Sequence, residues 1–149
     1  MTPRLAFPAY AIETRDEGGK LFVRDPIRRR WVRGTPEEWV RQHLLRYLGD
    51  LGYAPGLLAV EKGFPYGGKL WRADVVAYGR TGQALLLAEC KAPEVTVTQA
   101  TFDQLARYNA VVRAHALVVT NGLVHYCCVA DAGGWQFVEA IPAAADLNP

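Results

Sequence analysis

Two short stretches of the sequence decide the fold: RADVVAY at residues 72–78 and ALLLAECK at residues 84–91. They belong to mostly apolar segments, 70–78 and 84–91, that are bordered by turn residues, which is typical of β-strands. The segment 79–83 between them is short and contains two glycines, so we expect an antiparallel hairpin. The five apolar residues that begin the second strand predict burial on both of its faces.

Charged side chains occur on both strands of this hairpin, at a similar distance from the turn. Asp74 lies in the first strand, and Glu89 and Lys91 end the second. Because side chains alternate along a strand, Glu89 and Lys91 share one face and Cys90 takes the other. Counted back from the turn, Asp74 and Glu89 fall at matching depth, where cross-strand Cβ atoms are ~4.5–5.5 Å apart. Two carboxylates this close repel each other unless a cation lies between them.

These groups suit metal-assisted hydrolysis of a phosphodiester. Mg²⁺ prefers one or two carboxylates together with water and phosphate oxygens. Lys91 could orient or polarise the attacking water and stabilise charge on the phosphate. The structural alternative for Glu89 and Lys91 is a cross-strand ion pair on a solvated face.

Further elements are expected on both sides of the hairpin. Thr35, Pro36 and Glu38 predict the capped start of a helix that ends at Gly49 or Gly52. The first twenty residues are expected to be irregular, followed by a short hairpin over 21–33. Other predictions are strands at 57–61, 115–120, 123–129 and 135–138, a turn at 64–68 and a second helix at 98–113. This order predicts an α/β fold with a mixed sheet.

The composition predicts one domain over residues 1–149, with a core at about 20–130, an irregular N-terminal segment and a C-terminal tail. The chain has 149 residues, 50% of them hydrophobic and 21% charged, and a net charge of +2. These values exclude a disordered or fibrous protein. A charge this close to neutral does not by itself indicate a nucleic-acid partner.

The sequence also predicts where the protein resides. No apolar run approaches the ~18–20 residues of a membrane helix, and the N-terminus has no apolar region of a signal peptide. The three cysteines, Cys90, Cys127 and Cys128, lie on apolar strands and are expected to be buried free thiols. We therefore expect a cytoplasmic protein with no membrane partner.

The pattern of Asp74 followed by Glu89-x-Lys91 resembles the D…(D/E)xK signature of the PD-(D/E)XK nuclease superfamily. The surrounding sequence resembles the N-terminal nuclease domain of type I restriction enzyme R subunits over about residues 20–130. The motifs that carry this resemblance are residues 36–41, 72–74, 88–93 and 120–122, with Gln104 and Tyr108.

The resemblance implies a restriction-endonuclease-like αβββαβ core with a mixed central sheet flanked by helices. It also implies DNA cleavage that depends on Mg²⁺ (or Mn²⁺). By resemblance, Asp74 and Glu89 are metal ligands and Lys91 is the catalytic lysine. Gln104 and Tyr108 match an additional family motif that assists the site or contacts DNA.

The acid of the first helix has two candidates. We expect Glu38 to complete the metal shell and the catalytic set, although a capping box explains it equally well. Glu37 is expected to complement the helix dipole as an acid of the first turn. Tyr108 also has a structural alternative, as a core residue with its hydroxyl satisfied at the edge.

Arginines provide the candidate DNA contacts. Phosphates could be bound by Arg28, Arg29, Arg30, Arg33 and Arg72, together with Lys62 and Lys69. The alternative for the run at 28–33 is a solvated strand face.

The chain is too short for a motor domain and lacks a Walker lysine, so we expect a stand-alone nuclease domain. Possible partners are a second copy, in a homodimer, or a separate motor or specificity subunit. The competing hypothesis is a nucleic-acid-binding or assembly module that retains the fold without useful turnover, with salt-sensitive binding through its arginines.

Overall fold

The computed structural model describes residues 4–147 and contains two sheets. The larger sheet has the strand order β4-β5-β6-β7-β8-β9. Strands β6 and β7 pair in parallel, whereas the other neighbours in this sheet pair antiparallel. The strands are β4 (Leu58–Tyr66), β5 (Lys69–Tyr78), β6 (Ala84–Cys90), β7 (Ala116–Thr120), β8 (His125–Asp131) and β9 (Gly134–Val138).

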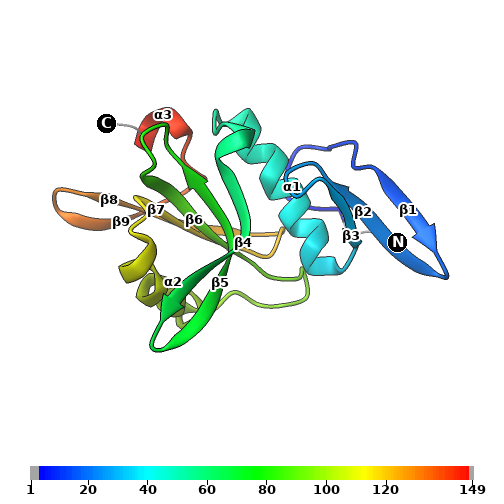
Figure 1. Ribbon diagram of the computed structural model, residues 1–149. Helices are drawn as coiled ribbons and strands as arrows, with labels where there is room; N and C mark the ends of the chain where they lie inside the picture. Colours follow the sequence, from blue (N-terminus) through cyan, green and yellow to red (C-terminus); the bar gives the residue numbers. More distant parts are fainter. Residues whose placement is uncertain (1–3, 148–149) are drawn as a thin grey trace.

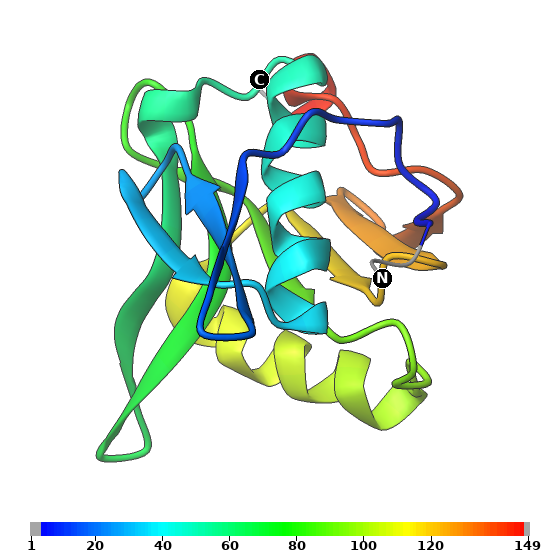
Figure 2. The same ribbon diagram turned by 90° about the vertical axis from the view of Figure 1, so that its right-hand side faces the viewer.

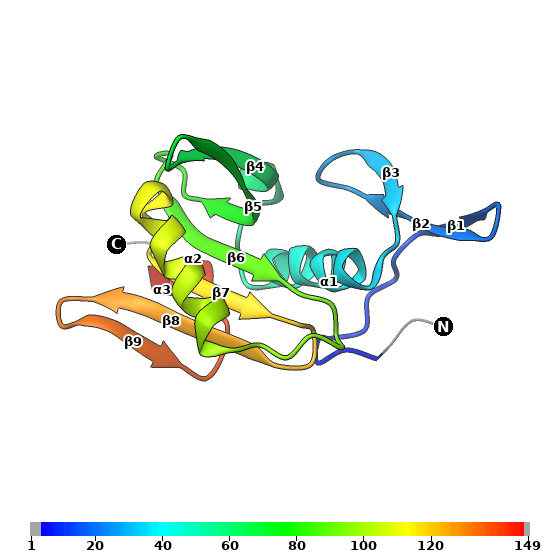
Figure 3. The same ribbon diagram turned by 90° about the horizontal axis from the view of Figure 1, so that it is seen from below.

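Two helices cover the two faces of this sheet (Figures 1 and 3). They are α1 (Pro36–Asp50) and α2 (Gln99–Val112), and α2 forms the crossover between the parallel strands β6 and β7. The order α1-β4-β5-β6-α2-β7 confirms the predicted αβββαβ core with a mixed sheet flanked by helices.

Strand β6 is the centre of both core layers. Leu86 packs into the cluster that contains Leu44 of α1, and Leu87 packs into the cluster that contains Leu105 of α2. Both leucines have no solvent exposure, and each buried side chain of this size contributes about 1.5–3 kcal/mol. The predicted burial of this strand on both faces is confirmed.

The predicted helix starts are confirmed. The hydroxyl of Thr35 accepts a 3.1 Å hydrogen bond from the amide of Glu38, and Pro36 occupies the first turn. Thr98 caps α2 in the same way, with the amide of Thr101 as donor at 3.3 Å.

The N-terminal region is more ordered than predicted. Residues Thr14–Glu17 form β1, which pairs with β2 (Lys20–Asp25), and β3 (Arg30–Arg33) completes a three-stranded sheet beside α1 (Figures 1 and 3). We call this sheet the meander. The expectation of an irregular segment was wrong for β1. The sequence gives no sign of this strand, because its four residues are all exposed and show no apolar alternation.

Strand β4 is also longer than predicted. It continues to Tyr66, so the turn expected over 64–68 contracts to Gly67 and Gly68. Both glycines have positive φ, 59° and 79°, as a two-residue hairpin turn of this type requires.

Both ends of the described chain join the core. Leu5, Ile141 and Leu147 are buried in the cluster under α1. The hydroxyl of Tyr53 donates a 2.7 Å hydrogen bond to the carbonyl of Pro142, just before α3 (Ala144–Leu147). The core therefore extends beyond the predicted range of 20–130. Within residues 4–147, the helices are all too short or too polar to cross a membrane.

Candidate active site

The hairpin of β5 and β6 brings Asp74 next to Glu89. Its register pairs Val75 with Ala88, so Asp74 and Glu89 are the next residues along the two strands. A carboxylate oxygen of Asp74 accepts a 2.7 Å hydrogen bond from the backbone amide of Cys90. This bond holds the Asp74 side chain across the strand end, at the depth that the turn count predicts.

Lys91 follows directly at the end of β6. Its ammonium nitrogen Nζ lies 3.6 Å from Oε1 of Glu89, and its backbone amide donates a 2.8 Å hydrogen bond to the carbonyl of Thr120 on β7. Cys90, between Glu89 and Lys91, is fully buried in the core layer under α1. A partly exposed carboxylate and ammonium are thus held on a rigid strand end.

The two carboxylates carry negative charge that their surroundings compensate poorly. Burial, and then the neighbouring charge of Asp74, raise the pKa of Glu89 to about 7. Burial also raises the pKa of Asp74, although the Cys90 amide and the Arg41 guanidinium oppose that shift. Oxygen donors whose negative charge is penalised in this way fit a hard divalent cation such as Mg²⁺.

A pocket of about 250 Å³ opens beside these groups. Its lining places Gln104 and Tyr108 of α2 next to Glu89 and Lys91, together with Trp71 of β5. The amide nitrogen of Gln104 donates a 3.2 Å hydrogen bond to the hydroxyl of Tyr108. The structure therefore brings these two predicted residues to the wall of the same pocket. Sequence reasoning missed Trp71, because an indole in a strand carries no sign of its contacts.

Glu38 lies in a buried ion-pair network. Its carboxylate is 2.7 Å from the guanidinium of Arg28 and 3.0 Å from that of Arg41, and it accepts a 3.1 Å hydrogen bond from the side chain of Gln42. Thr35 supplies the expected cap, but the Glu38 side chain turns inward. Its carboxylate is therefore already neutralised by protein cations, which leaves little reason for a metal to bind it.

Glu37 is the glutamate of α1 that interacts with the strand-end acids. Burial and the charge of Asp74 raise its pKa, while Arg41 and Lys91 act in the opposite direction. The sequence expectation of a simple dipole-complementing acid did not include this proximity. Tertiary packing decides which side of the first turn of α1 faces β5 and β6, and the sequence pattern does not predict it.

Arg41 connects the Glu38 network to the site. Its guanidinium nitrogen Nη1 is 3.5 Å from Oδ1 of Asp74, and its side chain is 8% exposed. Within residues 4–147, no group of three or more acidic, histidine or cysteine side chains is arranged to hold a metal ion. A cation bound here would therefore depend on two carboxylates, water and substrate oxygens, a set that Mg²⁺ accepts.

The predicted arginine contacts separate into two kinds. Arg28 is 12% exposed and forms ion pairs with Asp25, Glu38 and Glu61, so its guanidinium is already neutralised by carboxylates of the protein. Its turn faces Glu38 of α1 and Glu61 of β4, and the third carboxylate is Asp25 at the end of β2. Exposed arginines remain on the meander and on β5: Arg29, Arg30, Arg33 and Arg72.

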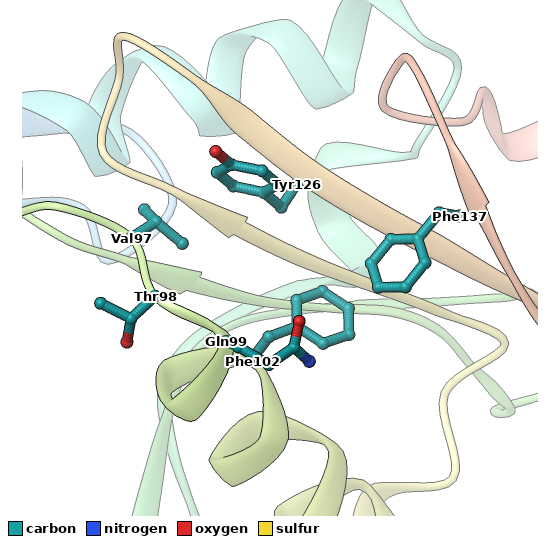
Figure 4. A pocket seen from close by; sticks show the side chains of 6 residues that line it. All are labelled: Val97, Thr98, Gln99, Phe102, Tyr126 and Phe137. Carbon is teal, nitrogen blue, oxygen red and sulfur yellow. The ribbon is translucent and has the colours of Figure 1, made fainter.

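A second hollow lies between the start of α2 and strands β8 and β9 (Figure 4). It has a volume of about 160 Å³, and the rings of Phe102 and Phe137 lie next to each other in its lining, with centroids 5.4 Å apart. No charged side chain is among its lining residues, which are Val97, Thr98, Gln99, Phe102, Tyr126 and Phe137. The charged candidate residues therefore lie at the strand end of β6 and not in this hollow.

Residues 36–142 match the profile of the family described as the type I restriction enzyme R protein N terminus (HSDR_N). The chain belongs to this family. Membership relates it to restriction endonucleases, and it agrees with the resemblance seen in the sequence. A search of curated protein sequences found no match.

One solved structure shares the fold. It is a fragment assigned to the HsdR subunit of a type I restriction enzyme from Vibrio vulnificus YJ016. The match has a TM-score of 0.57 and 19% sequence identity, and it covers 76% of this chain. The chain spans about a quarter (24%) of the length of that fragment. At this identity the comparison shows the fold alone.

Proposed function

We propose that this chain hydrolyses DNA phosphodiester bonds with the help of Mg²⁺ or Mn²⁺. The observation that carries the proposal is that Asp74, Glu89 and Lys91 lie close together at the end of β6. The family to which the chain belongs is described as a part of type I restriction enzymes. Partly buried carboxylates with raised pKa values beside a lysine and an open pocket are typical of a catalytic site.

Each residue has a role that its position supports. Asp74 and Glu89 would hold the cation, which when bound polarises the phosphate and activates a water molecule. Lys91 lies close enough to Glu89 to place a positive charge against the same phosphate. We assign the supporting acid of α1 to Glu37, because its charge interacts with Asp74 whereas the carboxylate of Glu38 is taken up by Arg28 and Arg41.

The pocket wall and the exposed arginines would position the DNA. Gln104 and Tyr108 line the pocket beside Lys91, where their amide and hydroxyl groups can donate to phosphate or sugar oxygens. Arg72 lies two residues before Asp74. Because the chain spans a quarter of the related fragment, we also propose that it works with other domains or subunits, or as a homodimer.

The test is cleavage of supercoiled plasmid with Mg²⁺ or Mn²⁺ at several salt concentrations. We expect nicked or linear product from the unmodified chain, and loss of product for Asp74→Asn and Glu89→Gln. Glu94→Gln is the matched control, since Glu94 is exposed in the loop after β6. Product that persists in both site variants would refute the proposal.

A second function is favoured by one observation. The Arg41 guanidinium already lies 3.5 Å from Asp74, which would suit a nucleic-acid-binding module that retains the fold but holds no metal. Calorimetric titration with Mn²⁺ separates the two functions. Binding that disappears in Asp74→Asn supports the nuclease, whereas no binding with or without DNA supports the module.

A further inference from the structure

The hairpin of β4 and β5 extends beyond Asp74 as a projecting arm (Figure 2). We call residues 62–73 the arm; its pairing runs from Lys62 with Ala73 to Tyr66 with Lys69. It contains three cations, Lys62, Lys69 and Arg72, and no acidic residue. Its charge is therefore complementary to a polyanion.

Aromatic rings continue from this arm onto α2. The indole of Trp71 stacks on the ring of Tyr108 at a centroid distance of 4.1 Å and an angle of 14°. Tyr66 meets the same Tyr108 ring edge-on at 4.9 Å, and Phe64 lies 6.0 Å from Trp71. We call these four residues the aromatic wall. Tyr66 is 36% exposed at the tip of the arm, so solvent reaches the outer end of the wall.

The aromatic wall and the charged groups line one pocket. Trp71 and Tyr108 line the same space of about 250 Å³ as Glu89 and Lys91. A phosphate placed at Lys91 would therefore bring its own or the adjacent base toward the rings. In a duplex both faces of a base are covered by its neighbours, so stacking on these rings costs the unstacking of the duplex, whereas an unpaired base offers a free face.

We infer that the arm and the pocket bind a single-stranded segment of DNA, with an unpaired base against the aromatic wall and a flanking phosphate on Lys69, which shares the Trp71 face of the arm. This inference rests on the proposed function for the position of the phosphate at Lys91. It adds the substrate class, which is DNA with an unpaired stretch or a frayed end at the scissile position.

Binding of fluorescein-labelled oligothymidine without metal, followed by anisotropy, tests the inference apart from cleavage. The unmodified chain should bind the single strand more tightly than a duplex of equal length. Tyr66→Ala should weaken single-strand binding about tenfold and leave duplex binding unchanged, since stacking on one aromatic side chain has an effect of this size. Tyr66→Phe keeps the ring and should bind like the unmodified chain.

The control is Tyr126→Ala, because Tyr126 is a comparably exposed tyrosine (46%) on β8, in the hollow that lacks charged residues. Melting of each variant by circular dichroism confirms folding. Equal affinity for single strand and duplex, no binding at all, or equal losses in Tyr66→Ala and Tyr126→Ala would overturn the inference. Selective single-strand binding without cleavage of either the plasmid or the single strand in Mn²⁺ would instead leave the binding inference standing and refute the proposed nuclease activity.

Discussion

The carboxylate of Asp74 on β5 accepts a 2.7 Å hydrogen bond from the backbone amide of Cys90 on β6. This bond crosses from one strand to the next just beyond the paired residues Val75 and Ala88. It fixes the orientation of one acid, while Glu89 and Lys91 extend from the positions on either side of Cys90. This contact, with the bond from the Lys91 amide to the Thr120 carbonyl, joins the three groups of the candidate site to the ends of neighbouring strands.

The first prediction concerns stability and pH without metal. Glu89 has a folded-state pKa of about 7, raised from 4.5 chiefly by burial. The folded state therefore binds more protons than the unfolded state between these values, and its stability falls as the pH rises through about 7. Glu89→Gln removes this penalty, so at about pH 8 it should raise the free energy of unfolding by about 1–3 kcal/mol.

Urea unfolding in EDTA from about pH 4 to pH 8 measures this effect. The advantage of Glu89→Gln should shrink on acidification and vanish below the unfolded pKa of 4.5. Glu94→Gln is the control and should change little at any pH. Equal stability of Glu89→Gln and the unmodified chain at the alkaline end would contradict the prediction.

The second prediction compares two adjacent glutamates of α1. Glu38→Gln should lower the free energy of unfolding by about 2–4 kcal/mol, because it leaves the buried guanidinium groups of Arg28 and Arg41 without their shared carboxylate. Glu37→Gln should not lower it, because burial and Asp74 raise the pKa of Glu37 and penalise its charge. Urea unfolding at neutral pH measures the free energy of unfolding of each variant, and Mn²⁺ calorimetry measures its metal affinity. Loss of metal affinity confined to Glu38→Gln would contradict our assignment of Glu37.

The third prediction separates two neighbouring arginines. Arg28→Ala should destabilise the fold by about 3 kcal/mol, because Asp25, Glu38 and Glu61 all lose their common partner. Arg30→Ala, at an exposed position of β3, should change stability by less than about 0.5 kcal/mol. Chemical denaturation of both variants is sufficient, and similar stabilities would show that Arg28 is not an internal anchor.

The fourth prediction concerns the thiols. All three cysteines are buried and free, and burial raises the pKa of Cys127 to about 12 and that of Cys128 to about 11. Because thiolates are the reactive form, dithionitrobenzoate should label none of them in the native protein at neutral pH and all three in guanidinium chloride. Rapid labelling of one thiol under native conditions would contradict the burial of that residue.

Much of the fold could be predicted because local signals agree with it. Thr35 and Thr98 mark helix starts with their own side chains, and the apolar run 84–88 indicates a doubly buried strand. Strand β1 could not be predicted, since its four polar residues are held only by pairing with β2. A short exposed strand leaves no periodic pattern in the sequence.

The residues of the candidate site could be predicted where the register of the hairpin places them. They could not be predicted where tertiary packing places them. The turn count was enough to place Asp74 beside Glu89. The choice between Glu37 and Glu38 depends on the rotation of α1 about its axis and on Arg28, which reaches α1 from the meander. Trp71 and Tyr108 come from β5 and α2, and only the tertiary fold brings their rings together.

Single-turnover cleavage of a labelled DNA by Lys91→Ala, at saturating Mn²⁺ and protein, tests the central claim most directly. Lys91 is a partly exposed strand-end residue, so the variant should fold, and saturating protein and Mn²⁺ keep the DNA bound even if its affinity falls. We predict a fall in the cleavage rate of about 10²–10⁴-fold, whereas Lys20→Ala on β2 should match the unmodified chain. Equal rates for Lys91→Ala and the unmodified chain would contradict the account.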